Sequence, residues 1–211
     1  MKFDFLKQNI SSLVIFGKNT LRSLENCPNN LDANIKYWLK KGEIISLKKG
    51  LYILRDTYNK ISVDDILEFI ANQLMEPSYL SFEYVLSKYQ LLTEPVRALT
   101  SATTKKTLVI KNALGTFRYY SISPQLFTAY QKKQKGNIII WEAKKSKAMF
   151  DYLYLHFFRQ PIINKTAIED LRINWENISK TEFKDVCSYE KLVNNKRLKK
   201  ALAIIKKEYY A

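Results

Sequence analysis

The sequence predicts an α+β protein built as two units, residues 1–56 and residues 57–211. Three observations support this prediction. Apolar runs with helical spacing alternate with short β-branched runs along the whole chain. The polar stretch 56–60 separates two such patterns and is the expected linker. Hydrophobic residues make up 46% of the 211 residues, which excludes a disordered chain and supplies apolar side chains for a core in each unit. A further division of the second unit near residue 160 stays open.

In the first unit, apolar spacing predicts a helix over 3–10, a short strand over 13–16 and a second helix over 18–24. A third helix is expected from about residue 30 to residue 41 and would end at Gly42. It carries an apolar stripe at helical spacing, made of Leu31, Ile35, Trp38 and Leu39. The runs 43–47 and 51–54, on either side of a turn at Gly50, predict a hairpin. This order of elements is typical of a winged helix-turn-helix.

Burial of the stripe would turn the opposite face of the third helix towards solvent, because successive residues are rotated by about 100°. That face is polar and basic. Asparagine can pair bidentately with adenine, and lysine can reach guanine or a phosphate. The residues expected to contact DNA are Asn30, Ala33, Asn34, Lys36, Tyr37 and Lys40 on the helix, with Lys48 and Lys49 at the hairpin tip. The alternative is a winged helix that is used for protein contacts.

In the second unit the sequence predicts helices over 63–74 and 81–91, capped by Ser62 and Ser81. Strands are expected over 107–110, 117–122 and 137–141, with a loop over 131–136. A helix over 146–158 is apolar nearly all round and should be buried, and the chain beyond residue 165 should be helical. The second unit is therefore expected to hold a small antiparallel sheet packed against helices, followed by a helical tail.

The charge balance points to a polyanionic partner. The chain has 35 Lys and Arg against 20 Asp and Glu, which gives a formal net charge of +15. A protein with this much positive charge usually binds nucleic acid, an acidic membrane surface or an acidic protein. A possible anion-binding surface comprises Lys105, Lys106, Lys111, Arg118, Lys144, Lys145 and Lys147. A solvated face is the default interpretation of such charge runs, including the basic C-terminal helix, and an extended anion-binding surface is the alternative to it.

The sequence lacks the motifs that several kinds of enzyme and metal chemistry require. The single histidine, His156, lies in an apolar stretch and is expected in the core or at its boundary. The sequence shows no zinc-ligand spacing and neither of the two common phosphate-binding loops. We therefore expect no metal, no cofactor and no enzyme activity. A metal-dependent nuclease or phosphotransferase remains the alternative, with carboxylates from Asp64, Asp65 and Glu68 or from Glu169 and Asp170.

The expected location is the cytoplasm. The first residues do not form a secretory signal, and no apolar run approaches the roughly 20 residues that span a bilayer. Cys27 and Cys187 are far apart in the sequence and are expected to be reduced thiols.

Five blocks of the sequence, in order over most of residues 35–155, resemble the AbiEi family. They are the wing-like stretch Lys40–Leu54, Pro77–Leu86, Leu99–Thr107, Gly115–Tyr119 and Lys147–Asp151. The family's last block begins with Pro-Glu, where this sequence has Lys145-Ser146, so a role of that acid is in doubt. The first 30 residues and the tail after residue 162 match the family only in general character. The DNA-contacting residues are therefore not carried over from the family and depend on the helical-face argument.

The resemblance implies a transcriptional regulator and antitoxin of a phage-defence toxin–antitoxin pair. Its winged helix would bind inverted repeats in the operon's own promoter and repress it. Its C-terminal domain would counteract a nucleotidyltransferase-like toxin without forming a stable complex with it. The alternative is a basic interaction module that binds RNA or an acidic protein and has no operator.

Overall fold

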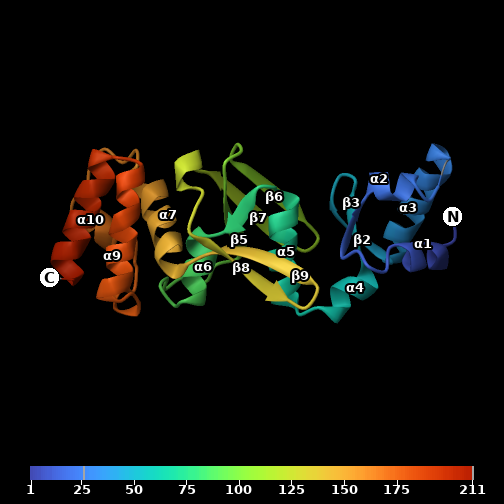
Figure 1. Ribbon diagram of the computed structural model, residues 1–211, viewed down its shortest axis with the longest axis horizontal. Helices are drawn as coiled ribbons and strands as arrows, with labels where there is room; N and C mark the ends of the chain where they lie inside the picture. The colour runs from blue at the N-terminus through green and yellow to red at the C-terminus, as the bar shows by residue number, and fades with distance from the viewer. Residues whose placement is uncertain (26, 211) are drawn as a thin grey trace.

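The computed structural model describes residues 1–25 and 27–210 and has an α+β fold, as predicted. The molecule is elongated, with the N-terminal elements at one end, a sheet in the middle and the C-terminal helices at the other end (Figure 1). The sequence also predicts a turn over residues 25–29. Residue 26 of this segment lies outside the described residues, and residues 28 and 29 belong to a helix.

The N-terminal unit contains the elements that the sequence predicts. They are α1 (Phe3–Asn9), β1 (Ile15–Gly17), α2 (Lys18–Arg22), α3 (Pro28–Lys41), β2 (Ile44–Lys48) and β3 (Leu51–Leu54). The three strands form an antiparallel sheet in the order β1-β3-β2. α3 begins two residues earlier than predicted, because Pro28 stands in its first turn, where a missing N–H costs nothing. Gly42 ends it in the left-handed conformation, with a φ of 70°.

The buried stripe of α3 is narrower than predicted. Leu31, Ile35 and Trp38 pack in the core of the N-terminal unit, where Trp38 is 2% exposed. The centre of the Trp38 ring lies 5.6 Å from that of Phe3. Leu39 is instead 36% exposed, so its predicted burial is wrong. It follows Trp38 by one residue and is turned by about 100° from it, which takes it off the stripe.

The predicted linker at 56–60 forms a helix, α4 (Arg55–Lys60), which connects β3 to the next helix. Its polar sequence is still well placed for a short helix. Asp56 lies in the first turn and Lys60 in the last, where each charge complements the helix dipole. α4 leads directly to α5 (Val63–Leu74), where the Oγ of Ser62 accepts a hydrogen bond from the backbone of Asp65, as predicted.

The second sheet is larger than predicted and is not antiparallel throughout. It has six strands in the order β6-β7-β5-β4-β9-β8, and the pairs β5–β7 and β4–β9 are parallel. Its strands are β4 (Ser78–Leu80), β5 (Ala98–Thr103), β6 (Leu108–Asn112), β7 (Gly115–Ser121), β8 (Tyr130–Lys135) and β9 (Ile138–Ala143). β8 occupies the predicted loop. It is an edge strand and carries polar side chains along most of its length, which hid it from the pattern of apolar residues.

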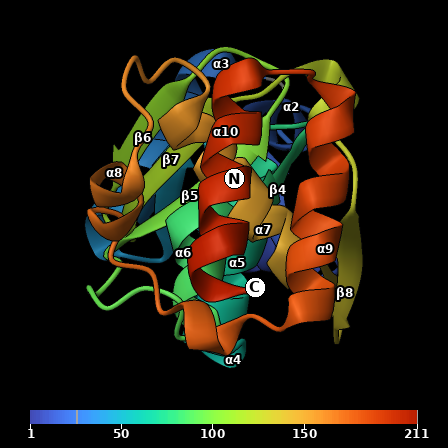
Figure 2. The same cartoon turned by 90° about the vertical axis from the view of Figure 1, so that its left-hand side faces the viewer.

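Helices pack against this sheet, and further helices follow towards the C-terminus. They are α6 (Phe82–Lys88), α7 (Lys145–Phe157), α8 (Lys165–Glu169), α9 (Lys180–Tyr189) and α10 (Lys196–Tyr209). α7 is buried on nearly every side, as predicted, with Ala148, Phe150 and Leu153 fully buried. Figure 2 shows α9 and α10 in front of α7, so that α7 lies between the sheet and the C-terminal helices.

The N-terminal sheet is buried on both faces. Ile44, Tyr52 and Leu54 pack in the core of the N-terminal unit. Ile45, Leu47 and Ile53 point to the other face and join the core of the larger unit. Burial on both faces explains why β3 has the continuous apolar sequence Leu-Tyr-Ile-Leu instead of an alternating one. The small sheet therefore joins the two units.

Candidate nucleic-acid interface

The outer face of α3 lies on the surface. Of the six helix residues predicted to contact DNA, Asn30, Ala33, Lys36, Tyr37 and Lys40 are exposed and Asn34 is half-buried. Tyr37 is 52% exposed. Because Leu31, Ile35 and Trp38 hold the opposite side of the helix in the core, this face is presented on a rigid element.

The charge of this face is positive, and the acidic side chain on its flank is paired. Asp32 lies on the flank of α3, and its Oδ1 is 2.5 Å from the Nζ of Lys18 at the start of α2. The hydrogen bond from Lys18 lowers the pKa of Asp32. On the other side the ammonium of Lys41 lies over the ring of Tyr37, 4.8 Å from its centre, and the hydrogen bond to Tyr37 raises the pKa of Lys41. Basic groups therefore dominate the exposed face of α3.

The two lysines of the hairpin tip lie in different surroundings. Gly50 makes the turn in the left-handed conformation, with a φ of 76°, and Lys49 beside it is exposed. The Nζ of Lys48 instead donates a hydrogen bond of 2.7 Å to the carbonyl of Leu74, at the C-terminal end of α5. The negative end of that helix dipole favours the ammonium. Lys48 therefore holds the hairpin to the larger unit, whereas Lys49 projects from the tip.

A basic groove of about 470 Å³ runs beside the hairpin. Its lining includes Lys49 and Arg55 from the N-terminal unit and Lys111 from β6 in the larger unit. The side chain of Asn112 fixes this arrangement, since it donates a hydrogen bond of 2.9 Å to the carbonyl of Leu47. Arg55 also donates to the carbonyl of Gly42 at 3.2 Å, just after α3.

Sequence reasoning missed Lys41 and Arg55 as parts of this basic region. The run Lys40-Lys41 was a usable signal for the first of them. No local signal could place Arg55, because its position beside the hairpin depends on the path of the chain into α4.

The seven residues predicted as an anion-binding surface do not share one environment. Lys105 and Lys106 are exposed between β5 and β6, and Lys144 is exposed just before α7. Lys111 lines the basic groove, while Arg118 lines a separate cleft. Lys145 lies 3.1 Å from Glu182 in an ion pair.

Lys147 is fully buried, so its place in the predicted surface is wrong. Its ammonium pairs with Asp151 one turn further along α7 and donates to the hydroxyl of Tyr79 at 2.8 Å. Asp151 also accepts a hydrogen bond from Ser81 at 2.7 Å. This bond takes the Ser81 side chain away from the start of α6, and the predicted cap there is wrong. A buried charge of this kind needs such partners, because burial without them is strongly unfavourable.

The lysines at 132, 133 and 135 lie on β8 instead of a loop. Lys133 and Lys88 both pair with Glu142, which is fully buried. Lys88 also pairs with Glu68, one of the carboxylates considered for a metal. Within residues 1–25 and 27–210, no group of three or more His, Cys, Asp and Glu side chains is arranged to hold a metal ion.

Two further predictions concern single residues. His156 is exposed and its ring centre lies 4.4 Å from that of the buried Tyr152, so of its two predicted places, the core and the boundary of the core, it occupies the boundary. Both cysteines are free, Cys27 at the surface and Cys187 half-buried.

The described part of the chain contains no helix with the length and apolar character needed to cross a membrane. Comparison of the sequence with protein-family models gives no match, and comparison with curated proteins gives none either.

Proposed function

We propose that this chain is a DNA-binding transcriptional autorepressor with a winged helix-turn-helix at its N-terminus. The observation that carries the proposal is the outer face of α3, where Lys36, Tyr37 and Lys40 are exposed above a buried stripe. The order of the helices and the antiparallel hairpin after α3 fit a winged helix, which places its third helix in the major groove. The net charge of +15 supports a polyanionic partner.

The geometry suggests how a duplex would lie. With α3 in the major groove, Asn30 and Lys36 would reach base edges, and Lys40 at the end of the helix would meet the backbone. Lys49 would approach the phosphates beside the hairpin. Lys49 and Lys111 both line the basic groove, so a backbone running along this side would contact both units.

The second part of the proposal is that this cytoplasmic repressor is also the antitoxin of a toxin–antitoxin phage-defence operon. This part rests on the ordered resemblance of residues 35–155 to the AbiEi family. In this proposal the larger unit counteracts a nucleotidyltransferase-like toxin that the neighbouring gene encodes, without a stable complex. Co-expression with that toxin tests it: growth should be restored by the full chain, and failure of rescue would contradict the antitoxin part alone.

Footprinting on the DNA upstream of the operon tests the repressor part. We expect protection of an inverted repeat, because regulators of this kind read two related half-sites. Fluorescence anisotropy then compares the protected sequence with a shuffled one. For about five neutralised phosphates, the logarithm of the binding constant should fall with a slope of roughly −4 to −5 against the logarithm of salt concentration.

Equal binding to the protected and shuffled sequences would end the specific-repressor proposal. Strong binding to RNA instead of duplex DNA would favour the alternative, a basic interaction module. The same measurement with Lys199→Ala, an exposed lysine on α10, serves as a control for loss of charge far from α3.

A further inference from the structure

A cleft of about 760 Å³ lies in the larger unit, between the sheet and the segments around α7. Its walls come from β5 and β7, from α6, from the stretch 92–98 and from residues 170–172. None of these segments belongs to α3 or the hairpin. The cleft is therefore separate from the candidate nucleic-acid interface, and its volume suits a ligand larger than a simple anion.

The basic residues of the cleft are all arginines. Arg97, Arg118 and Arg172 line it, three of the seven arginines in the chain, whereas none of the 28 lysines does so among the described residues. A general basic surface on this lysine-rich protein would show the opposite proportion. Arginine is the residue that binds phosphate oxygens with two parallel hydrogen bonds. Arg172 forms an exposed ion pair with Glu94 at 2.8 Å, which places it at the rim.

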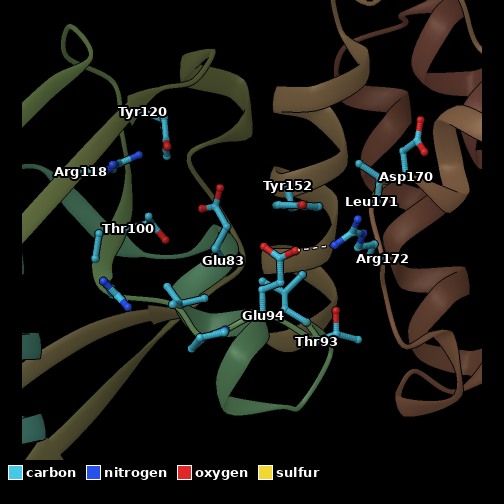
Figure 3. Close-up of a pocket in the computed structure, with 15 residues that line it drawn as sticks. Glu83, Thr93, Glu94, Thr100, Arg118, Tyr120, Tyr152, Asp170, Leu171 and Arg172 are labelled. Atoms are coloured by element: carbon cyan, nitrogen blue, oxygen red, sulfur yellow. Dashed lines mark hydrogen bonds and ion pairs between the residues drawn. The ribbon is translucent and has the colours of Figure 1, made fainter.

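Glu83 of α6 points into the cleft from its floor (Figure 3). Its Oε2 is buried and has no hydrogen-bond partner among the residues that the structure describes. Figure 3 shows the carboxylate between Arg118 and Tyr120 on one side and Tyr152 on the other. Burying a carboxylate oxygen without a hydrogen-bond donor costs free energy. None of the described residues around the cleft supplies that donor to Glu83.

Two tyrosines form part of the wall. The ring of Tyr120 is half-buried and packs edge-on against Phe82, with the ring centres 5.0 Å apart. Burial, together with the negative charges of Glu83 and Glu94, raises the pKa of Tyr152 to about 12. The carboxylate of Glu83 is therefore close enough to act on Tyr152, whose hydroxyl stays protonated at neutral pH. The cleft offers aromatic surface, an acceptor and guanidinium donors together.

We propose that this cleft binds a nucleotide, with its phosphate at Arg97 and Arg118 and the donor edge of its base at Glu83. A carboxylate accepts hydrogen bonds only, so it selects a base that presents N–H groups. Guanine presents two adjacent N–H donors and can satisfy both oxygens of Glu83, whereas adenine offers a single amino group. The cleft should therefore prefer guanosine monophosphate. This site does not depend on the proposed DNA binding.

Calorimetric titration of the full chain with guanosine monophosphate at about 0.15 M salt tests the proposal, because surface electrostatics are largely screened there. We expect saturable binding, and binding of adenosine monophosphate and guanosine at least about tenfold weaker. Arg118→Gln should weaken both nucleotides about tenfold or more. Glu83→Gln should weaken guanosine monophosphate and remove its advantage over adenosine monophosphate.

Arg197→Gln is the matched control, since Arg197 is exposed on α10 and does not line the cleft. It should leave binding unchanged. No saturation by any nucleotide at about 1 mM would overturn the proposal, and so would equal loss in Arg118→Gln and Arg197→Gln. Inorganic pyrophosphate that binds as tightly as the nucleotide would also overturn it, because the base would then contribute nothing. Each variant is first checked for an unchanged melting transition and unchanged DNA binding.

Discussion

Lys48 and Lys49 are neighbours in the sequence and both are exposed, but the structure ties the ammonium of Lys48 to another element. Lys48 donates to the carbonyl of Leu74, and Lys49 is exposed beside Gly50. A side chain held by a helix end is not available to a phosphate unless that bond breaks. The two residues therefore form a natural pair for testing whether the hairpin contacts DNA.

For Lys49→Ala we expect the slope of the salt dependence of DNA binding to become less steep by about 1, because one phosphate contact is lost. Lys48→Ala should change the slope little, although it removes the bond to α5. Anisotropy titrations at several salt concentrations measure both. A larger effect of Lys48→Ala than of Lys49→Ala on the slope would contradict this assignment.

Lys147 and Asp151 form a fully buried ion pair that also includes Tyr79 and Ser81. Lys147→Met should destabilise the protein by about 3–5 kcal/mol, because it leaves a buried carboxylate without its cation. Lys147→Met combined with Asp151→Leu should lower the free energy of unfolding by less than Lys147→Met alone. Urea unfolding checks this, and a double variant that is less stable than the single one would refute it.

At the scale of elements, α3 divides its residues between a face buried in the core and an exposed basic face. Leu31 and Trp38 hold the helix in place, and Lys36 projects from the opposite side. Any loss from a change on the exposed face should therefore appear in DNA binding and not in stability. Asn34 is half-buried and lies between the two faces.

Lys36→Ala and Asn34→Ala should each reduce discrimination between the operator and a mismatched sequence by about 1–3 kcal/mol. The reason is loss of a contact to a base edge, which acts on one sequence more than on another. Competition anisotropy with both sequences gives the difference. If the two sequences weakened equally, the residue would contact only the backbone.

The start of α9 carries a capping box made by Ser179 and Glu182, and Lys145 of α7 pairs with the same carboxylate. Although partial burial opposes ionisation, the hydrogen bonds from Ser179 and Lys145 lower the pKa of Glu182 below its ordinary 4.5. A lowered pKa in the folded state means that the charge stabilises the fold above pH 4.5. This contribution is lost as the pH falls through the lowered value.

Glu182→Gln keeps the capping geometry and removes the charge. At neutral pH it should lower the free energy of unfolding by about 0.5 kcal/mol. The difference from the unchanged protein should shrink as the pH falls below 4.5. Urea unfolding at a series of pH values measures this gap, and a gap that widened in acid would mean that the pKa is raised instead.

At the scale of the whole molecule, the N-terminal sheet makes two units into one structure. One of its faces packs on α3, and the other carries Ile45, Leu47 and Ile53 into the larger core. Exposure of that second face would place apolar side chains in water, so each unit depends on the other. The candidate DNA interface is consequently held in a fixed position relative to the sheet.

We expect the whole chain to unfold in one cooperative transition. Trp38 reports on the N-terminal core, and Trp175 reports on the C-terminal one. Variants in which Trp141 and one of these two tryptophans are replaced should show coincident urea midpoints by fluorescence, and both should agree with circular dichroism. A Trp38 transition at clearly lower urea would show that the N-terminal unit opens separately.

Local patterns in the sequence were sufficient where one element has one buried side. The stripe of α3, the cap at Ser62 and the turn at Gly42 depend on near neighbours, and the structure confirms the cap, the turn and the stripe without Leu39. Parts of the larger sheet were missed for the opposite reason. β5 is buried on both faces and so shows no alternation, and β8 is polar because it is an edge.

By itself, the sequence determined the α+β class, the helices and hairpin of the first 54 residues, and the basic character of the protein. Only the tertiary structure decided which charges face water. It buried Lys147 beside Asp151, bonded the ammonium of Lys48 to the end of α5, and brought Lys111 and Lys49 into the lining of one groove. The physical reason is the distance along the chain over which each effect acts. Helical periodicity and caps act over a few residues, whereas the surroundings of a charge depend on segments far apart in the chain.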